Sequence, residues 1–202
     1  MNHHYTGILD IISSHREALW DIHTHTLLPN TEVQQSVYNA FPYQQPLIPN
    51  EKGWYSVGLH PWHVANDWCS VLKTIENLAA HPRVVFIGET GLDRAISAPF
   101  SLQEEVFAAH IELSEKQKKP LLIHCVRAYP DVIRWRKQKK ASQPWIFHGY
   151  QANTTLTEQL LRVDKFYFSF GEKLAKEQIA TIFANLPLSR CFLETDNSTT
   201  SI

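Results

Sequence analysis

Two histidines separated by one residue, His23 and His25, follow an apolar run in the stretch ALWDIHTHTL, residues 18–27. If residues 18–22 form a β-strand, alternate side chains point to the same face, so Asp21 and the two imidazoles face the same way. A carboxylate and two imidazoles are costly to bury in an apolar interior unless each finds a partner. A polar face on an edge strand and a pair of metal ligands therefore explain this stretch equally well.

Residues of metal-ligand type also follow four later apolar runs. Glu89 follows VVFI, His124 follows LLI, His148 follows WIF, and the carboxylates of LETD follow FL. The carboxyl ends of the strands form the floor of the active site in α/β sheets and barrels, so we expect these side chains to meet there. Four imidazoles and two carboxylates exceed the needs of one ion, and a structural zinc site would be closed and often use cysteine. The pattern indicates two divalent cations, with Zn, Mn or Co suited to imidazole and Mg to oxygen.

Short apolar runs alternate with helical patterns along the chain, which predicts parallel strands joined by right-handed crossovers. The strands are predicted at residues 18–22, 36–40, 54–59, 84–87, 121–123, 145–147, 166–170 and 191–193. The helices are predicted at residues 70–80, 101–118, 131–140, 155–163 and 172–185. Ser101 and Glu104 match a capping box at the start of the second helix. We expect an α/β fold, a (β/α) TIM-like barrel, with an open doubly wound sheet as the competing arrangement.

The 202 residues are few for such a barrel, which typically needs ~250. Residues 26–52 contain prolines and no helical pattern, and only nine residues follow Leu193. The outer helices on both sides of strand 1 are therefore predicted to be missing. Residues 18–202 are expected to form one barrel, and an N-terminal extension, residues 1–17, to pack on it as a helix. A partner subunit on the strand-1 side of a homo-oligomer is the other way to cover the gap. The helical face of the extension would carry Ile8, Ile11, Ile12 and His15.

The composition predicts a globular protein without a strong electrostatic partner. The chain is 44% hydrophobic and 19% charged, and its formal net charge is −1, so any contact with nucleic acid must be a local site. No apolar run approaches the ~20 residues of a membrane span, and the N-terminus lacks the plan of a signal peptide. The three cysteines are odd in number and far apart, which fits reduced thiols in the cytoplasm.

The motifs DIHTH, VGLHP, GETGLD, LLIHC, FHG and LETD, in this order, resemble those of the TatD family of metal-dependent deoxyribonucleases, which are amidohydrolase-like barrels. The resemblance runs from about residue 18 to the end of the sequence. It implies a metal-dependent hydrolase that cleaves DNA phosphodiester bonds, commonly as an exonuclease on single strands or ends, with a hydroxide activated by a binuclear centre. It also implies that Glu89 bridges the two cations. The ligands it implies are His23, His25, Glu89, His124, His148 and Asp196.

The sequence departs from that family in four places. The regions flanking strand 1 are shortened, an N-terminal extension is present, HCVRA stands where HCR is usual, and HGYQA replaces an HCFSG-like segment. The implied ligand set is complete. The departures therefore bear on the choice of substrate rather than on catalysis.

Catalytic roles fall to Asp196 and Glu89 in this interpretation. Asp196 would orient the attacking hydroxide or act as its general base, with a pure ligand role as the alternative. His60, in GLHP, and Arg127 are the candidate substrate-binding residues, placed to contact phosphate. A structural hydrogen bond is the alternative for His60, and a surface salt bridge is the alternative for Arg127.

Five further residues near strand ends are expected to be mainly structural. Arg94 is predicted to form a surface salt bridge, and Asp93 to fix the loop that follows it. Trp62, Tyr129 and Tyr150 could stack on bases, although residues of this type are more often packed in the core.

Two other functions fit the same residues. The first is a related binuclear hydrolase of a small-molecule amide, lactone or phosphoester, because the same metal pair could polarise a carbonyl group. The second is a shortened, non-catalytic descendant that keeps a metal for stability or partner binding. The complete set of ligand-type residues argues against the second.

The basic run RWRKQKK, residues 134–140, is predicted to form a solvated face together with Lys116, Lys118 and Lys119. Outer helices run back from the strand carboxyl ends, so these helix ends lie at the bottom of the barrel, where cations suit a helix C-terminus. Charge reversal in this face is expected to leave cleavage of short oligonucleotides unchanged, as measured with end-labelled DNA. A collapse of activity would contradict this placement.

Overall fold

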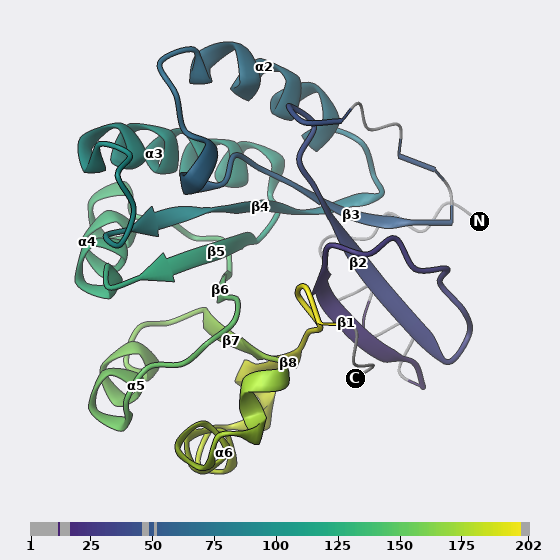
Figure 1. Ribbon diagram of the computed structural model, residues 1–202, viewed down its shortest axis with the longest axis vertical. Coiled ribbons are helices and arrows are strands. Elements are labelled where there is room, and N and C mark those ends of the chain that lie inside the picture. The colour runs from purple at the N-terminus through teal and green to yellow at the C-terminus, as the bar shows by residue number, and fades with distance from the viewer. Residues whose placement is uncertain (1–11, 13–16, 46–48, 51, 199–202) are drawn as a thin grey trace.

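The computed structural model describes residues 12, 17–45, 49–50 and 52–198. Within them, eight strands form a closed barrel in which every neighbouring pair is parallel and β8 pairs with β1 (Figure 1). This closed ring confirms the predicted barrel and excludes the open sheet. The strands are β1 (Leu19–Thr24), β2 (Gln34–Ala40), β3 (Trp54–Val57), β4 (Val84–Asp93), β5 (Leu121–Val126), β6 (Trp145–Phe147), β7 (Phe166–Phe170) and β8 (Cys191–Leu193).

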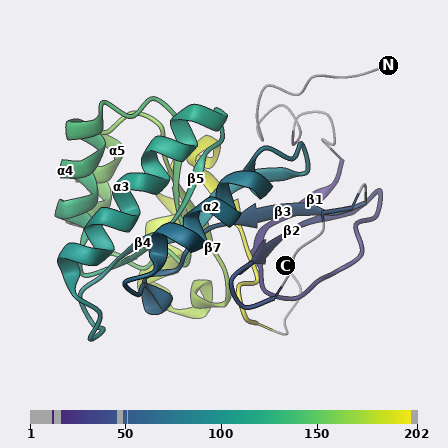
Figure 2. The same cartoon turned by 90° about the horizontal axis from the view of Figure 1, so that it is seen from above.

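The α-helices of the described residues lie outside the ring, as Figure 2 shows from above. The predicted helix at residues 172–185 is broken, because Lys176 has an extended backbone with φ −84° and ψ 124°. The other predicted helices agree with the structure within two residues at their ends. They are α2 (Trp68–Ala79), α3 (Phe100–Gln117), α4 (Tyr129–Lys139) and α5 (Thr154–Leu161). The second part of the broken helix is α6 (Glu177–Ala184). Three short 3₁₀ helices complete the set: η1 (Pro61–His63), η2 (Glu172–Ala175) and η3 (Leu188–Arg190).

Strand β1 has no outer helix on either side in the described residues, as predicted. Residues 25–33, between β1 and β2, contain no helix, and neither do residues 194–198, after β8. Most of the predicted N-terminal helix lies outside the described residues, so that helix stays a prediction. Ile12 is described, and it packs against the hydrophobic cluster that includes Trp20 and Trp54. No helix of the described segments is long and apolar enough to cross a membrane.

Two hydrophobic clusters hold the barrel. The larger joins helices to the outer faces of strands, as where Phe107 of α3 lies 5.6 Å from Trp145 of β6, between ring centroids. Leu122 and Ile146, in the smaller cluster, share strand alternation with His124 and His148 and therefore lie on the inner face of the barrel. The buried residues of the smaller cluster, which forms the floor beneath these histidines, are Trp20, Ile22, Val37, Trp54, Val85, Phe86, Leu122 and Ile146.

The predicted capping box is wrong. Helix α3 begins at Phe100, one residue earlier than predicted, so Ser101 lies inside the helix and the N-cap residue is Pro99. The helix start has no side-chain cap. Glu104 instead pairs with Arg134 of α4 and accepts a hydrogen bond from the indole of Trp135. A tertiary contact between helices has replaced the local one.

The basic face is only partly solvated, which corrects the prediction. Arg136 is 7% exposed, and its guanidinium lies 5.0 Å from the ring centroid of Trp145 and donates to the carbonyl of Gln143 at 2.9 Å. The Nζ of Lys119 donates to the carbonyl of Ala79 at 2.6 Å, at the end of α2. These two cations fasten the bottom of the barrel. The charge-reversal test therefore applies to the other basic residues of that face.

His110 of α3 is completely buried and holds the segment that follows β3. Its Nε2 accepts a hydrogen bond from the backbone N–H of Leu59 at 3.1 Å, and its Nδ1 lies 2.8 Å from the carbonyl oxygen of Val106. A backbone N–H can only donate, so Nδ1 carries the proton and donates to that carbonyl. Burial lowers the pKa of His110 to about 4, so the ring is neutral at physiological pH.

Stability is expected to fall as the pH drops from about 6.5 toward 4 through His110. Its folded pKa of about 4 lies below the ordinary value of 6.5, so in this window the unfolded chain binds more protons. The loss should approach about 1.4 kcal/mol per pH unit. Urea unfolding at several pH values measures it, and His110→Gln, which keeps an acceptor for Leu59, should show a shallower dependence. Identical slopes for the two proteins would contradict the assignment.

Candidate metal centre

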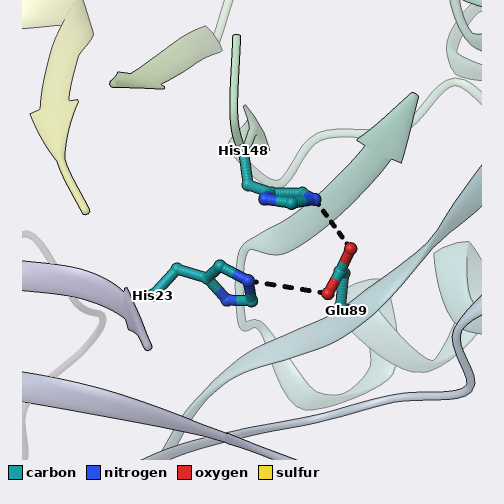
Figure 3. Close-up of side chains that lie close together, drawn as sticks. All are labelled: His23, Glu89 and His148. Carbon is teal, nitrogen blue, oxygen red and sulfur yellow. Dashed lines mark ion pairs between the residues drawn. The ribbon is translucent and has the colours of Figure 1, made fainter. Parts of the chain in front are cut away.

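The Glu89 carboxylate, on β4, lies at the centre of a cluster of imidazoles. Its Oε1 is 2.7 Å from Nε2 of His148 and 3.0 Å from Nδ1 of His124, whereas its Oε2 is 3.5 Å from Nε2 of His23 and 3.8 Å from Nε2 of His25. Figure 3 shows His23 and His148 each facing a different oxygen of the Glu89 carboxylate. The carboxylate is 2% exposed. Burial opposes its ionisation, but the surrounding imidazoles, His148 foremost, outweigh burial and hold the pKa of Glu89 well below its usual value.

Glycines allow β4 to bring Glu89 into this position. Gly88 and Gly91 have φ values of +143° and +152°, a region that other residues rarely adopt. A Cβ atom on Gly88 would lie 2.3 Å from the carbonyl oxygen of Leu122, and one on Gly91 would lie 1.9 Å from that of His124. The GETG sequence therefore lets β4 run against β5 without side chains between them, on both sides of Glu89.

Asp196 joins the cluster through the pairing of β1 with the segment after β8. The N–H of Asp196 donates to the carbonyl of His23 at 2.9 Å, and the N–H of His25 donates to the carbonyl of Asp196 at 3.0 Å. The Asp196 Oδ1 consequently lies 3.6 Å from Nε2 of His23 and 3.5 Å from Nε2 of His25. Burial first, with neighbouring His23 adding to it, lowers the pKa of His25 to about 4. Its neutral ring can offer a lone pair.

The donor atoms fit divalent cations. His23 is fully buried, yet neither of its ring nitrogens has a hydrogen-bond partner among the described residues. Such buried groups are normally satisfied. The separations of 3.5–3.8 Å between Nε2 of His23 or His25 and the carboxylates are too long for hydrogen bonds. They suit atoms that share one ion at roughly 2 Å each, and an all-N/O donor set suits Zn or Mn.

Two further carboxylates lie behind the histidines: Asp93 is within hydrogen-bond distance of the His124 ring, whereas Glu194 lies near His148 but too far away to accept a hydrogen bond from it. Asp93 Oδ2 lies 3.1 Å from Nε2 of His124, which leaves Nδ1 of that ring facing Glu89. Glu194 Oε1 lies 3.7 Å from Nδ1 of His148, and the same oxygen accepts a hydrogen bond from the N–H of Gly149 at 2.6 Å. Carboxylates behind metal-binding histidines fix the ring tautomer and orientation. The sequence interpretation missed this role for both residues; their position in the strand-end motifs GLD and LETD was the available signal.

His60 reaches the cluster as a hydrogen-bond donor. The backbone N–H of Trp62 donates to its Nδ1 at 3.1 Å, so in the neutral ring the proton lies on Nε2. That Nε2 is 3.0 Å from Glu89 Oε1 and donates to it. Although His60, Glu89 and His124 lie close enough to form a metal-binding triplet, this tautomer leaves His60 no lone pair toward an ion.

Asp21 does not share the site with the two histidines that follow it, although strict alternation predicts that it would. The register between β1 and β2 shifts between Asp21 and Thr24, so the alternation does not continue through the strand end. Asp21 Oδ2 accepts from the hydroxyl of Thr195 at 2.6 Å, and Oδ1 accepts from the Thr195 N–H at 3.0 Å. Oδ1 also lies 3.3 Å from the N–H of His23, so Asp21 supports the turn that carries the ligand-type residues.

The remaining candidates separate by position. Arg94 forms the expected salt bridge, with Asp131, at 2.8 Å. Arg127 is exposed and lies outside the lining of the cavity above the cluster. Tyr129 and Tyr150 pack in the large hydrophobic cluster, and Tyr150 is 1% exposed, so neither is an open stacking surface.

Asp93 does fix its loop, as predicted, by accepting the N–H of Ala95 at 2.8 Å. It also accepts the indole N–H of Trp62 at 2.9 Å. Trp62 is 62% exposed and lines the cavity. Of the three aromatic candidates, Trp62 alone stays available for stacking.

A parallel barrel with histidines and carboxylates gathered at the strand carboxyl ends is the architecture of metal-dependent hydrolases. The model of the TatD-related DNases matches residues 14–199, and the chain belongs to that family.

Individual proteins related to this chain are also named as metal-dependent hydrolases or as a nuclease. An uncharacterized metal-dependent hydrolase of Buchnera aphidicola is 29% identical over 96% of this chain and 71% of its own length. The metal-dependent hydrolase YabD of Bacillus subtilis is 31% identical over 70% of this chain and 57% of its own length. A Klebsiella pneumoniae protein named 3′-5′ ssDNA/RNA exonuclease TatD is 29% identical over 71% of this chain and 56% of its own length. The chain thus spans little more than half the length of the latter two.

The fold has a counterpart among solved structures. The crystal structure of YjjV, a TatD homologue from Escherichia coli K12, superposes with a TM-score of 0.72 at 18% identity, covering 88% of this chain and 78% of that one. At this identity the likeness concerns the fold alone.

Replacing Asp93 with Asn is expected to weaken metal binding about 10- to 100-fold, because the outer nitrogen of His124 loses its carboxylate. Titration of the metal-free protein with Mn²⁺, followed by calorimetry, measures the change. Asp131→Asn, which removes a carboxylate paired with Arg94 away from the cluster, is the matched control and should bind Mn²⁺ normally. Unchanged affinity in the Asp93 variant would contradict the positioning role.

Proposed function

We propose that the protein is a metal-dependent phosphodiesterase that removes nucleotides from the ends of DNA, with two divalent cations at the Glu89 cluster. The observation that carries the proposal is the division of the Glu89 carboxylate, in which Oε1 faces His124 and His148 and Oε2 faces His23 and His25. One carboxylate therefore serves two groups of ligands. Membership in a family with a named nuclease relative supports nucleic acid as the substrate.

Six residues would hold the cations. His23, His25 and Asp196 with Glu89 Oε2 would hold one ion, and His124 and His148 with Glu89 Oε1 would hold the other. Bound there, such ions supply Lewis acidity toward a phosphate oxygen and lower the pKa of water. The buried strand ends keep the donors in place before substrate arrives, which limits the cost of reorganisation.

Asp196 and His60 are the residues proposed to act on the substrate side. The Asp196 side chain is 35% exposed, far more than Glu89, so its carboxylate can orient a water molecule and accept a proton from it. His60 Nε2–H points at the centre and can donate to a phosphate oxygen as well as to Glu89. Arg127 stays a predicted phosphate contact, reached only by a substrate that extends beyond the cavity.

The state of the cysteines bears on where in the cell the protein is located. Cys69, Cys125 and Cys191 are free, and burial raises the pKa of Cys125 and Cys191, which fits unreactive thiols in a cytoplasm. We therefore propose a cytoplasmic location. The homo-oligomer through the strand-1 side stays a prediction.

One observation favours the alternative of a small-molecule hydrolase. Among the described residues that line the cavity above the cluster there is no Lys or Arg. A nuclease that follows a long strand would need such cations. Substrates of both kinds must therefore be compared directly.

Metal-loaded protein is expected to degrade end-labelled single-stranded DNA and to hydrolyse a chromogenic phosphodiester. Chelation of the metal should abolish both activities. Glu89→Ala should lower both rates by at least about 10³-fold, because both groups of ligands lose their shared carboxylate.

The controls separate the competing functions. Glu105→Ala removes an exposed carboxylate of α3 outside the site and should leave both rates unchanged. Turnover confined to a panel of lactones and amides would refute the nuclease and support the small-molecule hydrolase. Metal binding without turnover of any substrate would support the non-catalytic descendant.

A further inference from the structure

A cavity of about 670 Å³ opens from the candidate metal centre toward β2, β3 and the segments that follow them. Its volume is typical of sites for drug-sized ligands and is too small for a folded stretch of a DNA strand. The residues beyond the candidate ligands on which the inference rests are Phe41, Gln44, Gln45, Asn50, Trp62 and His63. They are aromatic rings and carboxamides.

The lining carries no fixed positive charge. No Lys or Arg belongs to it among the described residues; Lys173 lines an adjoining cavity of about 120 Å³ that shares Asp196 and Asn197 with the large one. Proteins that hold several phosphates of a strand do so with Lys and Arg. This lining favours an uncharged group in the large cavity, beyond the phosphate at the cluster.

Aromatic rings form a continuous wall from the cluster outward. The ring centroid of Phe41 lies 5.3 Å from that of His25 and 5.6 Å from that of His63. Trp62 lies 5.0 Å from His60, and its indole is fixed by the hydrogen bond to Asp93. Rings already held in place lose little freedom when a planar group stacks on them, so the wall is suited to a base.

The carboxamides lie beside this wall. Gln44 Nε2 lies 3.2 Å from Nε2 of His63, and Nδ1 of that ring lies 2.8 Å from the hydroxyl of Tyr43. Gln44, Gln45 and Asn50 are exposed, and a ligand can reach their amide groups by replacing the surface contacts that Gln44 makes with His63 and Asn50 makes with the N–H of Lys52. Carboxamides pair with the donor and acceptor edges of nucleobases.

We infer that this cavity binds the base of a single terminal nucleotide, while the phosphodiester that joins this nucleotide to the strand lies at the metal cluster. This inference rests on the proposed phosphodiesterase function and adds to it the group that the enzyme recognises. Recognition is confined to one nucleotide. Chain length and salt concentration should therefore affect binding little.

Three chromogenic diesters of equal charge test the inference with the metal-loaded full chain. They are the p-nitrophenyl esters of thymidine 5′-phosphate, of the corresponding abasic deoxyribose 5′-phosphate and of methyl phosphate. The thymidine ester is expected to have a kcat/KM at least about tenfold above that of the abasic ester, mainly through KM, because one stacked base is added. Equal values for these two esters would overturn the base site.

Variants of the wall show where the base binds. Trp62→Leu and Phe41→Leu should each reduce the ratio of thymidine to abasic kcat/KM toward one, and this ratio does not depend on overall activity. Trp62 is largely exposed, so its replacement leaves the core intact. Phe100→Leu, at the start of α3 and outside the cavity lining, is the matched control and should keep the ratio. Wall variants with an unchanged ratio would overturn the inference.

Chain length gives an independent test. KM for a dinucleotide and for a dodecanucleotide should be similar, and the salt dependence should correspond to about one phosphate contact. A dodecanucleotide with much lower KM and a steep salt dependence would overturn confinement to one nucleotide. Hydrolysis of the methyl ester without a base preference would leave the phosphodiesterase standing and remove only this inference. Failure to hydrolyse any ester or DNA would remove both.

Discussion

The structure depends on one buried carboxylate that faces four candidate metal-binding imidazoles. Glu89 is placed among them by β4, which runs close to β5 because Gly88 and Gly91 carry no side chain. A buried anion without compensation would cost several kcal/mol, and so would several imidazoles without partners. The buried carboxylate and the buried imidazoles compensate one another, so neither can be buried without the other. Among the described residues, neither buried ring nitrogen of His23 has a hydrogen-bond partner, and this observation supports the proposed cations.

Carboxylates outside the cluster also help to position the candidate ligands. Asp93 and Glu194 face the outer nitrogens of His124 and His148, and Asp21 joins β1 to the segment that carries Asp196 by accepting hydrogen bonds from Thr195. These carboxylates lie on different strands, so the positions of the imidazoles depend on closure of the barrel. Asp93 also accepts from the exposed indole of Trp62. A group stacked on that indole would thereby be linked, through this hydrogen bond, to the carboxylate that orients a candidate ligand.

The region between β1 and β3, which is shortened in this chain, supplies side chains that line the cavity. Strand β1 has no outer helix on either side in the described residues, and the chain between β1 and β3 is used instead for Phe41, Gln44 and Asn50 around the cavity. Those side chains are neutral. Arg136, a cation of α4, packs against Trp145 and does not line the cavity. The protein thus combines a site suited to phosphodiester chemistry with a surface poorly suited to following a long strand.

The sequence by itself determined the barrel, the lack of a helix in the described residues between β1 and β2, and the residues that gather at the strand ends, because alternation of apolar runs and the shared direction of parallel strands are local patterns. Only the tertiary structure decided which atoms face one another. A register shift in β1 removes Asp21 from the cluster, a backbone N–H fixes the tautomer of His60, and contacts between helices replace the capping box at Ser101. Likewise, Arg127 and Trp62 both follow strand ends, yet only Trp62 lines the cavity. Such outcomes depend on contacts between residues far apart in the chain, and no spacing along the sequence encodes them.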